Sequence, residues 1–205
     1  MALLAGAGSL GLSPRADLAL RLLLPAAALV WLAPRVLRLR VERSALSVAL
    51  GVAVFLLWIG PDLLFAGWRQ HWLFQNALTG TLKSTLPPGA SGDTLSLWLR
   101  ALRATLVVPV LEELFWRGWL MRWIINPDFE KVPLGAYQAR AFWITAILFA
   151  LEHGPYWEVG LLTGMVYGWW MVKTRSVEDC ILAHAVTNGC LSLFVVFSGR
   201  WEYWL

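Results

Sequence analysis

Residues 44–61 read SALSVALGVAVFLLWIGP and contain no charged side chain. A helix needs about 20 apolar residues to cross the hydrocarbon core of a bilayer, so this run is nearly a complete crossing. Five other apolar runs follow the same pattern, near residues 17–33, 97–125, 141–153, 159–172 and 179–197. The pattern predicts an all-α fold, a polytopic membrane helix bundle of about six transmembrane helices.

The composition of the chain agrees with this class. Hydrophobic residues make up 59% of the sequence and charged residues 15%, whereas soluble domains carry about 25% charged residues. We expect residues 1–205 to form a single membrane domain, because short helices joined by short loops use this length fully. The net charge is +4, but the basic residues are spread between apolar runs, which argues against nucleic acid as a partner. The expected surroundings are the lipid bilayer.

Basic residues are concentrated in alternate loops, which predicts an orientation. They are Arg35, Arg38, Arg40 and Arg43 in the first loop, Arg122, Lys131 and Arg140 around the third, and Lys173 and Arg175 in the fifth. Short loops rich in Lys and Arg face the cytoplasm, so both termini are predicted on the opposite side. The aromatic-rich stretch 62–96 is predicted to contain an amphipathic segment on that far membrane surface.

The third apolar run contains three ionisable residues close together, in the sequence LEELFWR at 111–117. Each ionised side chain near the centre of a membrane helix costs about 2.5–3.5 kcal/mol on insertion scales. Glu113 and Arg117 are four residues apart and are expected to pair on one helix face. Glu112 points about 100° away and needs a polar cavity. An isolated Glu–Arg pair is most simply a structural salt bridge, but the second glutamate favours a functional site.

Two of the three histidines lie in apolar runs. The fourth run ends in FALEH, which places His153, and the sixth contains HAVTN, which places His184 and Asn188 one turn apart on the same face. A lone histidine in an apolar helix is more often a hydrogen-bonded core residue. A histidine and an asparagine on one face, however, present donors suited to a developing oxyanion. A carboxylate and an imidazole in a dry cavity are able to hold and deprotonate a water.

The motifs EExxxR, FxxxH and HxxxN, in this order on successive apolar runs, resemble those of the CPBP family of intramembrane glutamic proteases. That family includes the type II CAAX prenyl endopeptidases and relatives noted in bacteriocin self-immunity. The resemblance covers about residues 97–197, the expected catalytic core. It implies an intramembrane endopeptidase that hydrolyses a peptide bond of a membrane-associated peptide or protein with glutamate-activated water.

The resemblance also implies a role for each motif residue. Glu112 would be the general base on the attacking water, with His153 helping to orient that water. His184 and Asn188 would stabilise the tetrahedral oxyanion. The remaining two site residues, Glu113 and Arg117, would support the site by fixing the helix and its charge balance.

The sequence around the motifs, at 115–123 and 152–157, resembles the CAAX-protease-related branch of bacteria with exosortase and PEP-CTERM sorting systems. This resemblance implies a multi-pass protein of the bacterial inner (plasma) membrane. Bacteria do not generally prenylate their own proteins, so a prenylated substrate does not follow.

Other functions remain as alternatives. No cofactor is expected, and zinc is the weaker option, because HExxH sites place both histidines on one helix and Asn188 is a poor zinc ligand. A non-enzymatic membrane scaffold or bacteriocin-immunity-type protein would use the same bundle. A small transporter would also use buried carboxylates, but the chain has no internal repeat. Two further acidic residues are expected to be structural: Asp179 as a cap of the sixth helix and Glu158 as a solvated side chain.

Overall fold

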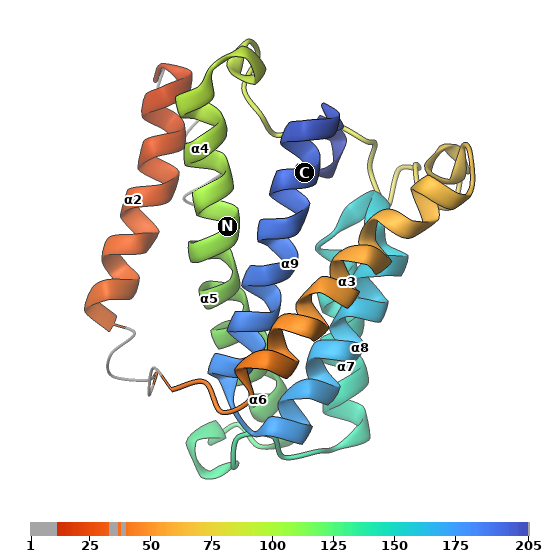
Figure 1. Cartoon of the computed structure of the whole chain (residues 1–205). Helices are drawn as coiled ribbons and strands as arrows, with labels where there is room; N and C mark the ends of the chain where they lie inside the picture. Colours follow the sequence, from red (N-terminus) through yellow and green to blue (C-terminus); the bar gives the residue numbers. More distant parts are fainter. Residues whose placement is uncertain (1–11, 33–36, 38–39, 205) are drawn as a thin grey trace.

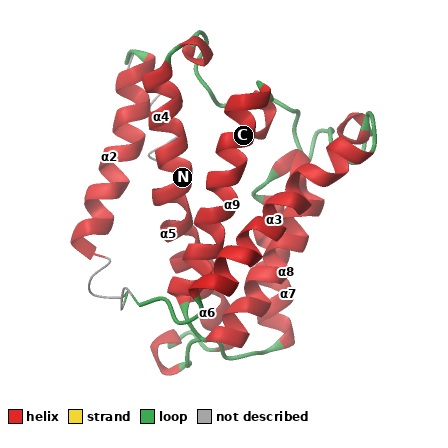
Figure 2. Cartoon of the chain, viewed as in Figure 1, coloured by secondary structure: helices red, strands yellow, loops and turns green. Residues whose placement is uncertain are grey.

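The computed structural model describes residues 12–32, 37 and 40–204, which form helices and loops without a strand in that part of the chain (Figure 2). The helices are α2 (Pro14–Leu32), α3 (Ser44–Leu64), α7 (Ala139–Leu151), α8 (Trp157–Thr174), α9 (Val177–Ser198) and one long helix over 94–125. This long helix comprises α4 (Thr94–Leu102), η5 (Arg103–Val107), α5 (Val108–Glu113), η6 (Leu114–Leu120) and α6 (Met121–Ile125), of which η5 and η6 are π-helical.

Each of the six helices coincides with a predicted apolar run, so the all-α fold is confirmed. Three of them, α3, the long helix 94–125 and α9, are long and apolar enough to cross a membrane. Helix α7 has 13 residues, which is about 20 Å of helix and less than the thickness of the hydrocarbon core. Short 3₁₀ turns occupy the connections: η3 (Trp68–Gln70), η4 (Ala90–Gly92), η7 (Phe129–Lys131), η8 (Gly154–Tyr156) and η9 (Trp201–Tyr203).

The three basic connections lie at one end of the bundle, as the predicted alternation requires (Figure 1). Gly135, in the third connection, approaches the end of α8 so closely that a Cβ atom there would lie 2.7 Å from the carbonyl oxygen of Met171. Asp179 ties the first connection to the start of α9, because its carboxylate accepts from the backbone N–H groups of Glu42 and Arg43, both at 2.9 Å. Arg35 and Arg38 lie outside the described residues.

The prediction that Asp179 caps α9 is wrong. Ser176 is the N-cap, and its hydroxyl accepts from the backbone N–H of Asp179 at 3.1 Å. The Asp179 carboxylate is instead occupied by the backbone before α3 and by the hydroxyl of Ser47, which donates at 2.8 Å. An acid in the first turn of a helix is therefore used to hold a second helix in place.

Small residues bring the helices into close contact. On α8, Gly160, Gly164 and Gly168 face α7, and a Cβ atom at Gly164 would lie 3.1 Å from Ala146. Between α3 and α9 the approach is closer, since a Cβ atom at Gly51 would lie 2.3 Å from a backbone carbonyl oxygen of α9. The hydroxyl of Thr187 donates to the Gly51 carbonyl across this contact at 2.7 Å. Small residues permit such contacts in membranes, where apolar burial alone gives helices little reason to associate.

The opposite end of the bundle holds the connection from α3 to α4, and here the predicted amphipathic segment differs from the structure. The chain forms the short turn η3 and an irregular loop that covers the turn η8, with Arg69 and Phe74 buried. Glu158 is not simply solvated, because its carboxylate accepts from Arg69 at 2.7 Å. Trp72 and Leu78 remain uncovered, so apolar side chains are still presented outward at this end.

Candidate active site

The long helix departs from α-helical geometry on both sides of the two glutamates. The first π-helical segment, η5, precedes Pro109, and the second, η6, begins at Leu114 immediately after Glu113. Such segments are rare in helices and occur frequently at functional sites. The two glutamates therefore lie at the end of a short α-helical stretch, Val108–Glu113, between two π-helical segments, and Arg117 lies in the second of these segments.

The first widened stretch explains the position of Asn188. In η5 the backbone N–H of Val108 bonds to the carbonyl of Arg103 rather than to that of Ala104. The next residue, Pro109, has no N–H to offer. The carbonyl of Ala104 thus lacks its usual donors, and the side-chain amide of Asn188 donates to it at 2.9 Å. This contact fixes the amide of the HxxxN motif on the helix that carries the glutamates.

Glu113 and Arg117 form the predicted pair, with the Arg117 Nη1 atom 2.9 Å from Glu113 Oε1. Neither side chain is exposed. The guanidinium also lies 4.6 Å from the ring centre of Phe149 and 5.5 Å from that of Tyr167, and it donates to the carbonyl of Gly164 at 3.4 Å. The arginine is therefore held by α7 and α8 as well as by its own helix.

His184 shares the same carboxylate oxygen, which the sequence did not reveal. Its Nδ1 atom lies 2.8 Å from Glu113 Oε1, from a position 71 residues further along the chain. Because a carboxylate oxygen accepts, Nδ1 carries the proton and Nε2 points away from Glu113. The rings of Tyr167 and Phe149 lie beside the imidazole, with centres at 5.3 and 6.3 Å. Glu113 thus orients His184 in addition to pairing with Arg117.

His153 owes its orientation to the four-residue spacing of its motif. The carbonyl of Phe149 is in the last turn of α7, where carbonyls lack helical partners, and the backbone N–H of His153 bonds to Ala150 instead. The His153 Nδ1 atom donates to this Phe149 carbonyl at 2.6 Å. Nε2 is then the free acceptor of the neutral ring. Trp58 packs edge-on against the imidazole at 5.2 Å between ring centres.

Glu112 lies next to this group without joining its hydrogen bonds. In the described part of the chain its Oε2 atom is buried and has no hydrogen-bond partner. The charged groups around it are His184, Glu152, Glu113 and Arg117. A buried carboxylate oxygen without a partner is costly unless a water or another donor occupies it. The Oε2 atoms of Glu112 and Glu113 therefore each have an open position for a donor.

The structure brings the predicted residues together to different degrees. Glu112, Glu113, Arg117 and His184 form one cluster, and His153 adjoins it through the ring of Phe149. Asn188 contacts the backbone of η5, one turn of α9 beyond His184. Within the described residues, no group of three or more His, Cys, Asp or Glu side chains has the arrangement of a metal site.

Comparison with known proteins gives one match. Residues 94–190 match the family described as type II CAAX prenyl endopeptidase Rce1-like. This segment runs from the start of α4 into α9 and includes all six predicted site residues. No curated protein and no solved structure matches the chain.

Proposed function

Because its segment 94–190 matches the family described as type II CAAX prenyl endopeptidase Rce1-like, we propose that this protein hydrolyses a peptide bond of a membrane-associated substrate with water activated by Glu112. The family and the three helices long enough to cross a bilayer make the chain an integral membrane protein of the CAAX protease type. Its placement in the bacterial inner membrane and its membership of the exosortase-associated branch are parts of the proposal. The observation that carries the mechanism is the Glu113 carboxylate, shared by Arg117 and His184 beside an unpartnered Glu112.

Charge balance supports the protonation states that the mechanism needs. Two carboxylates, Glu112 and Glu113, lie with the guanidinium of Arg117 and the imidazole of His184. A proton on His184 reduces the excess of negative charge in this buried cluster, to which Glu152 also contributes. His184 then has a second N–H, at Nε2, directed away from Glu113 and available to an oxyanion.

Proton transfer follows from these states. The Glu112 carboxylate takes a proton from water while the water oxygen bonds to the carbonyl carbon of the substrate. The Nε2 atom of His153 accepts the second hydrogen of this water and so aligns it, because its Nδ1 atom is committed to Phe149. The Glu112 carboxylic acid then gives its proton to the leaving amine nitrogen as the C–N bond breaks.

The oxyanion receives two donors in this proposal. One is the Nε2–H of His184, and the other is the second N–H of the Asn188 amide, whose first N–H is donated to Ala104. Removal of one such donor costs about 10²–10³ in rate in enzymes of this kind. The π-helical segment η5 contributes here by exposing the carbonyl that positions the amide.

The test compares cells that produce the wild type, Glu112→Gln, and the matched control Glu130→Gln, an exposed glutamate in the third connection. Mass spectrometry of membrane and secreted peptides should find a precursor that stays uncut only in Glu112→Gln cells. A synthetic peptide spanning that cleavage site should then be cut by the purified wild type and by Glu130→Gln. Wild-type cleavage rates for purified Glu112→Gln would refute the glutamate mechanism.

A further inference from the structure

The backbone that carries His153 is a turn and not a helix. Helix α7 ends at Leu151, and η8 occupies Gly154–Tyr156 before α8 begins. Gly154 has a φ of +52°, which disfavours any residue with a side chain, and the following proline has no N–H for a hydrogen bond. The place of the imidazole therefore depends on what holds this turn from outside.

Arg69, from the connection between α3 and α4, holds the turn directly. Its Nη1 atom donates to the carbonyl oxygen of Pro155 at 2.8 Å, and its guanidinium lies 4.2 Å from the ring centre of Tyr156. The same guanidinium donates to Asp62, at the end of α3, at 2.9 Å and to Glu158, in the first turn of α8, at 2.7 Å. One buried side chain thus joins the turn to two helices.

Other contacts of the same connection reach the turn independently. The indole N–H of Trp157 donates to the carbonyl of Leu73 at 3.0 Å. A Cβ atom at Gly154 would lie 2.9 Å from the carbonyl oxygen of Thr79, so the two backbones touch. Residues 73–79 of the connection therefore pack around the turn. Position 154 requires glycine, because a side chain there would collide with the backbone of the connection.

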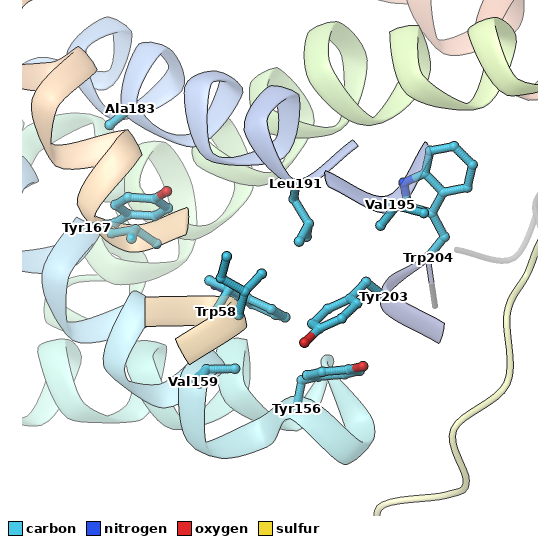
Figure 3. Packing of buried hydrophobic residues seen from close by; sticks show 11 residues of the cluster. Trp58, Tyr156, Val159, Tyr167, Ala183, Leu191, Val195, Tyr203 and Trp204 are labelled. Carbon is cyan, nitrogen blue, oxygen red and sulfur yellow. The ribbon is translucent and has the colours of Figure 1, made fainter. Parts of the chain in front are cut away.

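An aromatic stack completes the link to the imidazole. The ring of Tyr156 contacts those of Trp58 and Tyr203, with ring centres at 5.7 and 5.1 Å, and Figure 3 shows the three side chains gathered together. Trp58 in turn packs on His153, and its indole N–H donates to the hydroxyl of Thr163 at 2.8 Å. A shift of Tyr156 would therefore be transmitted to the ring that packs against His153.

We infer that Arg69 is a positioning residue for His153, and that the connection over 62–82, outside the segment that matches the family, acts as a clamp on the catalytic turn. The inference rests on the proposed function, because it concerns the residue that aligns the water. A buried arginine with two carboxylate partners adds little stability over an apolar residue of the same size, but it fixes geometry through several directional bonds. The requirement for geometry is strict, since a misplacement of about 1 Å can reduce an enzymatic rate about 10²-fold.

The first experiment observes the imidazole without any substrate. The chain has only three histidines, so spectra of protein with ¹⁵N-labelled imidazole contain few signals, which His71→Gln and His153→Gln assign. Arg69→Lys retains the charge but loses the planar fork that reaches Pro155 and Asp62 together. It should move the His153 signals by more than their linewidth and leave those of His184 in place.

Two further variants control this result. Arg15→Lys alters an equally bidentate arginine at the exposed pair with Asp93 and should move neither signal. Glu158→Gln removes one partner of Arg69 at a partly exposed position, so it preserves the fold and should give a smaller displacement of the His153 signals. Unmoved His153 signals in Glu158→Gln and in folded Arg69→Lys would overturn the inference. Equal displacement of His153 and His184 would also overturn it, because it would indicate a general loosening of the bundle.

A kinetic experiment then connects the clamp to catalysis. With the synthetic peptide described above, Arg69→Lys should lower kcat about 10- to 100-fold with little change in KM, since a positioning residue acts on His153 and not on substrate binding. A proportional rise in KM with unchanged kcat would contradict a role through His153. The spectra distinguish the two proposals, because displacement of His153 signals is measurable even in a protein that cleaves no peptide.

Discussion

Replacement of Arg117 by methionine tests the energetic core of the site. The substitution keeps a long side chain against Phe149 and Tyr167 but leaves Glu113 with His184, at 2.8 Å, as its remaining hydrogen-bond partner. Neither Glu113 nor Arg117 is exposed, and removal of one partner from a buried pair costs about 3–5 kcal/mol. In a chain of this length each kcal/mol lowers the melting temperature by about 2–4 °C, so a decrease of about 6–20 °C is expected.

A double-mutant cycle identifies the source of this loss. Glu113→Gln in the Arg117→Met background removes the orphaned charge, so the double variant should be more stable than the sum of the two single changes predicts, by about 0.5–3 kcal/mol. Cleavage should nevertheless stay lost, because His184 no longer has a carboxylate at Nδ1. The second substitution should therefore offset part of the loss of stability without restoring cleavage.

The assay is thermal unfolding in detergent, followed by tryptophan fluorescence alongside cleavage of the synthetic peptide. Arg15→Met is the control, because it removes an arginine from an exposed ion pair and should lower the melting temperature far less than Arg117→Met does. A melting temperature of Arg117→Met within about 2 °C of the wild type, or strict additivity in the cycle, would refute a buried charge pair at this position.

Four other outcomes are expected. Glu112→Gln should abolish cleavage while the melting temperature stays near that of the wild type. Wild-type activity should be unaffected by a metal chelator; its loss with a chelator and recovery with zinc would replace the glutamate mechanism by a zinc mechanism. Asn188→Ala should reduce the rate about 10²–10³-fold. It should also destabilise the protein by about 1–3 kcal/mol, because the Ala104 carbonyl loses its donor. A drop in rate without loss of stability would contradict the contact with η5. Gly51→Val should prevent correct assembly of α3 on α9, since even a Cβ atom at this position would lie 2.3 Å from a backbone oxygen of α9. Normal yields of folded Gly51→Val protein would argue against that contact. The Arg15 guanidinium holds the pKa of Asp93 below its ordinary value. The stability that the Asp93 carboxylate contributes should therefore be present above about pH 4 and disappear as the pH falls through the lowered pKa. Melting temperatures measured against pH should show Asp93→Asn less stable than the wild type at pH 7 and equal to it in strong acid.

Local patterns in the sequence were sufficient for the helices and for one contact of the site. Hydropathy identified all six helices to within a few residues, because insertion in a bilayer depends on the apolarity of each segment. The Glu113–Arg117 pair followed from four-residue spacing on one helix. The choice of Asp179 as a cap and of Glu158 as solvated was wrong, because each carboxylate binds a partner more than 85 residues away in the chain.

The remaining features of the site depend on how the helices and the long connection pack. The bond between Glu113 and His184 requires a particular rotation and depth of α9 against the long helix, which the apolar pattern of α9 does not specify. The contact of Asn188 with Ala104 depends on a π-helical stretch, whose register the periodicity of an α-helix cannot reveal. The position of Arg69 depends on a connection with no regular period at all. Sequence alone therefore determined the membrane class, the helices and the set of candidate site residues, because these are properties of short segments. Only the tertiary structure decided which of those side chains form hydrogen bonds with one another, since that depends on distances between segments that are remote in the chain.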